Sequence, residues 1–190
     1  MKDFPISRID ARRICGFTII ELMIALAVLG VLLIIAVPSF SNTLKRHRLI
    51  GATEALQQSL VYAKSEALNR SQAVTLTVKR SSITDWCFGI SVSSAACDCT
   101  IDDITNVASC KVDDSLKVVR SSSYRGVTSS PVADDSVTFS PARGETTAKQ
   151  IDFEASNSGG LAMRVIVTGL GMVRLCSPGG GGKVYGFEDC

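Results

Sequence analysis

The chain has 190 residues, enough for one domain of ordinary size with an appendage. Hydrophobic residues make up 46% of it, which is enough for a core and argues against wholesale disorder. The net charge is +2, but four of the 20 basic and two of the 18 acidic residues lie within residues 1–16, so the remainder carries 16 of each. Such a balance argues against a dedicated nucleic-acid binder, which usually has a basic excess.

An apolar run covers residues 17–37, and Glu21 is its only charged side chain. As a helix it spans roughly 30 Å, the thickness of the hydrocarbon core of a bilayer. Arg12 and Arg13 directly precede it, so the positive-inside rule predicts a cytoplasmic N-terminus and an exported remainder. A secretory signal peptide fits less well, because the run is long and "AVPSFSN" is a poor cleavage site. A plain anchor leaves Glu21 unexplained, since an ionised carboxylate in hydrocarbon costs about 3 kcal/mol.

The stretch "GFTIIEL" at residues 16–22 resembles the cleavage and methylation motif of type IV pilins and of type II secretion pseudopilins. The resemblance implies a leader over residues 1–16 that a prepilin peptidase removes between Gly16 and Phe17, followed by N-methylation of Phe17. It also implies that Glu21 neutralises the new amine of a neighbouring subunit during assembly, because a buried carboxylate persists when it is paired. The alternative is that Glu21 simply reaches the aqueous interface, which lies barely one helical turn away.

Beyond Pro38 the helical pattern resumes and predicts an amphipathic segment over residues 38–71. Its apolar stripe should face a globular head. The members of the stripe are Leu49, Ala52, Leu56, Leu60, Ala63 and Ala67. Residues 45–48, "KRHR", form a basic cluster that we interpret as a solvated helix face, in preference to a contact with anionic lipid.

From residue 73 the apolar period changes to two, which predicts strands. Candidate strands lie at residues 73–79, 86–92, 116–120, 136–140 and 150–153, and a terminal hairpin covers residues 161–176. Residues 94–115 read as a cysteine-bearing insertion and residues 121–136 as a loop. A helix followed by antiparallel strands is an α+β plan, in which strands adjacent in sequence should form a meander packed on the helix. Together with the motif, this implies a type IV pilin fold: a long N-terminal helix, half of it transmembrane, packed on a β-rich head over residues 72–190.

Seven cysteines divide unevenly about the apolar run. Cys15 precedes it, and an even number that permits three disulfides in an oxidising compartment follows it. These six are Cys87, Cys97, Cys99, Cys110, Cys176 and Cys190. The spacing of the first four fits no common zinc pattern, and His47 is the only histidine. We therefore expect no metal site, no cofactor and no enzymatic activity.

Nearly the whole chain resembles the GspH/FimT group, which contains minor pilins and secretion pseudopilins. The resemblance rests on the helix phrase "LQQSLVYAKSEALNRSQAVTL" and on the terminal phrase "GMVRLC". It implies a FimU-like minor type IV pilin that helps to initiate or cap a pilus. The alternatives are a FimT-like pilin that captures DNA for natural transformation and a GspH-like type II secretion pseudopilin.

The DNA-capturing members carry a Gly-Arg-x-Arg phrase on the terminal hairpin. The matching positions here are Gly171, Met172, Val173 and Arg174, so only Arg174 remains as a possible DNA contact. The expected partners are other major and minor pilins, the prepilin peptidase, the inner membrane and its pilus assembly platform, with DNA bound weakly if at all. The implied location is the inner membrane, in a single pass with the head in the periplasm, and then the extracellular pilus, at its tip.

A disulfide between Cys176 and Cys190 is expected, similar to the C-terminal disulfide loop of pilins. The glycine-rich segment between them, "SPGGGGKVYGFED", has high backbone entropy, and closing such a loop contributes roughly 3 kcal/mol in the chain-entropy account.

Two pairings remain for the other four cysteines, because Cys97 and Cys99 are too close in sequence to bond each other. We favour Cys87–Cys97 with Cys99–Cys110, since both loops are short. The alternative is the crossed arrangement, Cys87–Cys99 with Cys97–Cys110.

Overall fold

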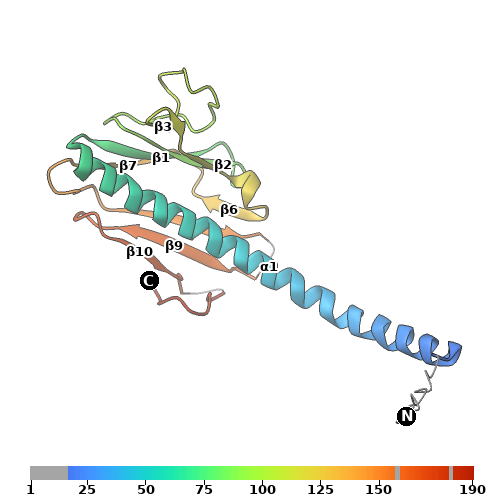
Figure 1. The fold of residues 1–190 in the computed structure, drawn as a ribbon. Helices are drawn as coiled ribbons and strands as arrows, with labels where there is room; N and C mark the ends of the chain where they lie inside the picture. Colours follow the sequence, from blue (N-terminus) through green and yellow to red (C-terminus); the bar gives the residue numbers. More distant parts are fainter. Residues whose placement is uncertain (1–16, 157–158, 180–181) are drawn as a thin grey trace, which may run out of the picture. The chain divides into compact units, whose positions relative to one another are not determined.

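The computed structural model describes residues 17–156, 159–179 and 182–190. The chain divides into two compact units, Met1–Phe40 and Ser41–Cys190. Helix α1, Ile19–Arg70, begins in the first unit and ends in the second (Figure 1). All the strands lie in the second unit, which we call the head.

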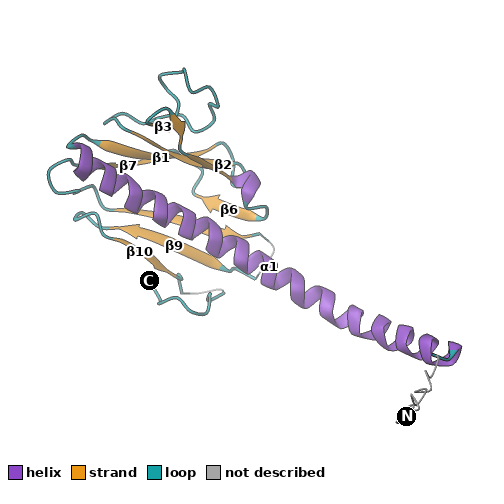
Figure 2. Ribbon diagram, viewed as in Figure 1, coloured by secondary structure: helices purple, strands orange, loops and turns teal. Residues whose placement is uncertain are grey.

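Two four-stranded antiparallel sheets form the head around α1 (Figure 2). The first has the order β5-β2-β1-β7, with strands Val118–Arg120, Trp86–Ser91, Val74–Arg80 and Asp135–Phe139. The second has the order β10-β9-β8-β6, with strands Val173–Cys176, Ala162–Val167, Lys149–Ala155 and Val127–Ser130. A small hairpin of β3, Lys111–Val112, and β4, Ser115–Leu116, and a 3-10 turn η1, Ser121–Ser123, complete the head. The predicted α+β class is confirmed.

The predicted meander is correct only in part. Strands β1 and β2 pair with each other, as do β8, β9 and β10 in sequence. However, β7 pairs with β1, where Val137 lies opposite Leu76, and β6 pairs with β8. The first pairing places the buried side chains of β7 beside those of β1, so shared burial outweighs sequence proximity.

Strand β6 lies within residues 121–136, for which the prediction of a loop was wrong. Its sequence, "VTSS", is short and polar and carries no strong strand pattern. Tertiary contacts hold it instead: the indole N–H of Trp86 donates to the Val127 carbonyl at 3.0 Å, and Arg80 Nε donates to Ser129 Oγ at 2.8 Å. Both contacts come from the first sheet, so β6 is fixed by residues more than 40 positions earlier.

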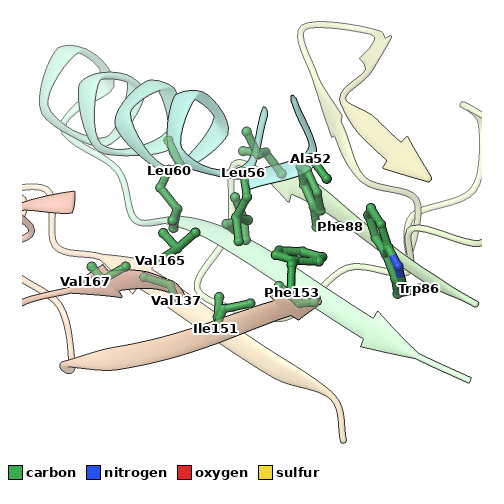
Figure 3. Close-up of a cluster of buried hydrophobic side chains, with 14 of the residues drawn as sticks. Ala52, Leu56, Leu60, Trp86, Phe88, Val137, Ile151, Phe153, Val165 and Val167 are labelled. Atoms are coloured by element: carbon green, nitrogen blue, oxygen red, sulfur yellow. The ribbon is translucent and has the colours of Figure 1, made fainter. Parts of the chain in front are cut away.

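The core is formed where α1 meets the two sheets. All six residues of the predicted apolar stripe are completely buried. Figure 3 shows Leu60 directed from α1 toward Val165, and Leu56 directed toward Phe153. The rings of Phe153 and Trp86 meet edge-on, with 4.9 Å between their centroids. The whole cluster, together with all three disulfides, lies within residues 41–190, so the head has a complete core of its own.

Three disulfides bond the six cysteines of the head. Cys176 bonds Cys190, as the sequence predicted. The other four are crossed, Cys87–Cys99 and Cys97–Cys110, so the preferred pairing of neighbours along the chain was wrong.

The register of the first sheet explains this crossing. The Cys97 N–H donates to Thr77 Oγ1 on β1, and Thr77 lies opposite Gly89, against which Cys110 packs. The side chain of Lys79, one step further along the same face, holds Asp98 at 2.7 Å and lies opposite Cys87. Residues 97–99 therefore run along β1 from Thr77 to Lys79, which places Cys97 beside Cys110 and Cys99 beside Cys87.

The Lys79–Asp98 ion pair holds the cysteine-bearing insertion, residues 94–115, against the first sheet. We expect Asp98→Asn to lower the free energy of unfolding of the head by about 1.5 kcal/mol at neutral pH. Hydrogen bonds from Lys79 and Thr100 lower the pKa of Asp98 to about 2. Because its folded-state pKa is depressed, the carboxylate stabilises the fold at neutral pH, and this stability is lost as the pH falls toward about 2.

Urea unfolding of the head at neutral pH and near pH 2 measures this effect. The free energies of unfolding of the unchanged head and of Asp98→Asn should converge at the lower pH. Asp114→Asn, on an exposed carboxylate of the β3–β4 turn, is the matched control. A deficit of Asp98→Asn that is equal at both pH values would contradict the assignment.

Candidate functional site

The start of α1 is capped by Thr18. Its Oγ1 accepts a hydrogen bond from the Glu21 N–H at 3.3 Å, and its carbonyl accepts one from Leu22 at 3.2 Å. Threonine followed three positions later by glutamate is the spacing of a capping box. Glu21 thus lies in the first turn, where the helix dipole favours a negative charge.

The predicted processing site lies at the edge of the described residues. Gly16 and the remainder of the leader fall outside them, and Phe17 is the first residue described, with 75% of its surface exposed. Glu21 is also exposed. Cleavage after Gly16, methylation of Phe17 and the assembly role of Glu21 therefore stay predictions.

The first turns of α1 expose large apolar side chains on every side. From residue 19 to residue 34 these side chains are between 52% and 81% exposed. They are Ile19, Ile20, Leu22, Met23, Ile24, Leu26, Val28, Leu29, Val31, Leu32, Leu33 and Ile34. An apolar surface of this extent marks a place where lipid or protein covers the chain.

Among the residues that the structure describes, we find no helix both long enough and apolar enough to cross a membrane.

Within the head, the turn between β9 and β10 is clamped to α1. Lys64 Nζ donates to the carbonyls of Leu170 and Gly171, at 3.0 Å each. Gly171 has a positive φ of 68°, and a Cβ there would lie 2.1 Å from the carbonyl oxygen of Gly144. The turn therefore has one tightly fixed position against the rest of the head.

Arg174, the possible DNA contact, is exposed on β10, the edge strand of the second sheet. On the adjoining strands, Arg164 is paired with Asp152 through two hydrogen bonds of 2.6 and 2.8 Å, so its charge is neutralised. Met172 stands exposed at the position two residues before Arg174, where a second arginine would strengthen phosphate binding. The hairpin thus presents one available guanidinium.

We expect the head to bind duplex DNA weakly, with a Kd of about 10⁻⁵ M or higher at about 0.15 M salt. Met172→Arg should tighten binding and steepen the salt dependence by about one released counterion, since it adds a phosphate contact. Fluorescence anisotropy across a salt series measures both. Tight binding by the unchanged head that Arg174→Ala abolishes would contradict this expectation and favour DNA capture.

An open groove of about 360 Å³ lies between α1 and the β4–β5 segment. Its walls are mainly apolar, with Ala55 and Tyr62 on one side and Leu116 and Val118 on the other. Its one ionic side chain, Lys117, has its ammonium 5.8 Å from the centre of the Tyr62 ring. Across the described part of the chain, no three His, Cys, Asp or Glu side chains are grouped to hold a metal ion.

Comparison with known protein families identifies the class of protein. Residues 52–171 match the family described as Type II transport protein GspH, which is more than half of the chain. The chain belongs to the GspH family. Residues 11–37 of this GspH-family chain also match the prokaryotic N-terminal methylation motif, a segment that includes Gly16, Phe17 and Glu21.

Two solved structures of the type IV minor pilin FimU from Pseudomonas aeruginosa (strain PAO1) are similar to the GspH-family chain, each at 19% identity. The first covers 70% of this chain and 95% of that chain, with a TM-score of 0.45. The second, in another crystal form, covers 69% and 98%, with a TM-score of 0.43. No curated protein matches the sequence.

Sequence reasoning missed the role of the basic cluster at residues 45–48. Arg46 Nη2 donates to the Tyr185 carbonyl, and Arg48 Nη1 donates to the Arg125 carbonyl at 3.1 Å. The interpretation as a solvated helix face is therefore wrong for these two arginines. Their partners are 139 and 77 positions away, so no local pattern could have indicated them.

Proposed function

We propose that this GspH-family chain is a minor type IV pilin, a structural subunit without catalytic activity that helps to initiate or cap a pilus. The observation that carries the proposal is the continuity of three features along one chain. A methylation motif over residues 11–37 leads into a helix with Glu21 in its capped first turn. The same helix ends in the core of a disulfide-bonded head.

Processing would create a positively charged amine at Phe17, with which the Glu21 carboxylate of a neighbouring subunit could pair. Cleavage between Gly16 and Phe17 by a prepilin peptidase would give Phe17 a cationic amine, and methylation keeps that amine basic. The amine would then lie four residues before Glu21, within the same exposed apolar surface. In a filament, apolar side chains of neighbouring subunits would cover this surface. The carboxylate and the amine would then lose their contact with water, and only an ion pair between them would offset the free-energy cost of that desolvation.

The proposed location follows from the same segment. Residues 17–37 anchor the subunit in the inner membrane with its leader in the cytoplasm and its head in the periplasm. Three disulfides suit that oxidising compartment. The partners are other major and minor pilins, the prepilin peptidase and the inner-membrane assembly platform, and the final place is the pilus tip.

A second candidate function is that of a secretion pseudopilin. The description of the matched family, Type II transport protein GspH, favours it. The two functions share the processing steps and differ in the filament that the subunit enters.

Intact-mass analysis of the protein recovered from sheared pili tests the proposal. We expect a chain that begins at Phe17, carries one added methyl group and contains three disulfides. A terminus at Met1, or a cut after residue 37, would contradict the processing scheme. If the chain is correctly processed but absent from pili, and is required for protein secretion, the function of a secretion pseudopilin would take the place of the proposed minor pilin function.

A further inference from the structure

Carboxylates neutralise nearly half of the basic side chains of the head. Seven lysines and arginines form salt bridges with aspartate or glutamate. They are Arg70, Lys79, Arg120, Arg143, Lys149, Arg164 and Lys183. Residues 41–190 contain 16 basic and 15 acidic residues, so the head as a whole is nearly neutral. Any attraction to an anionic partner must therefore come from a local group of cations.

Such a group lies around the first head turns of α1. Arg46 and Arg48 donate to main-chain carbonyls, of Tyr185 and Arg125, and Arg125 is itself exposed. In the part of the chain that the structure describes, none of these three arginines has a carboxylate partner. Carbonyl hydrogen bonds hold the two guanidinium groups in place and leave their charge intact. Lys183 and Asp189 of the nearby C-terminal loop neutralise each other, so Glu188 is the one acidic side chain left in that loop.

An exposed aromatic ring accompanies these cations. Tyr185 is 75% exposed, and the Arg46 guanidinium lies 5.9 Å from the centre of its ring. The loop that carries Tyr185 is closed by the Cys176–Cys190 disulfide. Tyrosine beside arginine is the composition typical of a protein surface at the membrane–water interface, because both side chains combine an apolar stem with a polar end.

The position of these residues along the chain fits that interface. Arg46 follows Val37, the last residue of the apolar run, by nine positions, which is about 14 Å of helix. The headgroup layer extends about 6 Å beyond the hydrocarbon, and charges act over about 8 Å at physiological salt. Guanidinium groups at this distance therefore lie within electrostatic range of the headgroup phosphates.

We infer that Arg46, Arg48 and Arg125, together with Tyr185, form a surface that binds the anionic phospholipid headgroups of the membrane in which the subunit is anchored. This inference rests on the proposed function, which places residues 17–37 in that membrane. Each basic residue near an anionic membrane surface strengthens binding about fivefold. Three such residues hold the head at the membrane reversibly, so that assembly into a filament can still remove it.

Co-sedimentation of the head, residues 41–190, with lipid vesicles tests the inference. We expect binding to phosphatidylcholine vesicles that contain phosphatidylglycerol, loss of that binding at high salt, and no binding to pure phosphatidylcholine. Arg125→Glu should lower the partition coefficient about 25-fold, because it changes the charge by two. The substitution keeps the main-chain carbonyl that holds Arg48, and thermal unfolding will confirm that the fold is intact.

Arg143→Glu is the matched control, since it makes the same charge change on a side chain that is 81% exposed in the loop after β7. It should change vesicle binding less than about twofold. An equal loss with Arg143→Glu, or no dependence on phosphatidylglycerol, would overturn the inference. If the head does not bind anionic vesicles while the full chain still enters pili, only the lipid-binding surface is refuted. If the head binds the vesicles but the full chain never enters pili, only the proposed function is refuted.

Discussion

Glu21→Gln is expected to leave the protein cleaved, methylated and inserted, but to lower its amount in pili at least about tenfold. Glutamine can still take the third position of the capping box that Thr18 begins, so the start of α1 should persist. The negative charge, however, is lost, and a neighbour's amine would be buried without its partner. Breaking a buried ion pair in this way costs about 3–5 kcal/mol, which is more than a tenfold change in recruitment requires.

Quantitative blotting of sheared pili against whole membranes measures this loss. Glu54→Gln is the matched control, because Glu54 is also an exposed glutamate of α1 but belongs to the head. Thr18→Ala provides a second comparison: it removes the cap, worth about 1 kcal/mol, and keeps the charge. If Glu21→Gln pili contained normal amounts of the protein, the pairing of Glu21 with an amine would be refuted.

Gly171→Ala is expected to destabilise the head by about 3 kcal/mol, the largest effect that we predict for a single methyl group. The residue has a φ of 68°, which already disfavours a side chain, and the new Cβ would lie 2.1 Å from the Gly144 carbonyl oxygen. That oxygen belongs to the backbone and cannot move aside as a side chain does. Relieving the contact would also disturb the Lys64 hydrogen bonds to Leu170 and Gly171.

Thermal unfolding of the head measures this effect as a decrease in Tm of about 10 °C. Gly159→Ala separates the two causes, because Gly159 has a nearly identical φ of 66°, and no described residue other than its chain neighbours has an atom within 4 Å of the place that its new methyl group would take. It should cost about 1 kcal/mol, the backbone contribution alone. Equal Tm values for the two variants would show that the contact with Gly144 relaxes without cost.

Local sequence patterns were enough to predict much of the fold and the family to which the chain belongs. The spacing of six apolar residues indicated the face of α1 that is buried, and alternation indicated β1, β2, β7, β8 and the terminal hairpin. The processing motif was readable because a glycine, a phenylalanine and a glutamate in fixed register need no tertiary context. The Cys176–Cys190 bond was also predicted, from the resemblance to the C-terminal disulfide loop of pilins and from the high backbone entropy of the glycine-rich loop that it closes.

The sequence by itself therefore determined that a helix precedes the strands, which face of α1 is buried, and the methylation motif of the N-terminal segment, because each depends on residues a few positions apart. Tertiary structure alone decided the crossing of Cys87–Cys99 and Cys97–Cys110, the pairing of β7 with β1, the formation of β6, and the anchoring of Arg46 beside Tyr185. Each of these joins segments from about ten to well over one hundred positions apart. At each place, several partners of equivalent chemistry compete. Strand register and shared burial decide which partner is bound, and both exist only once α1 and the two sheets have packed together.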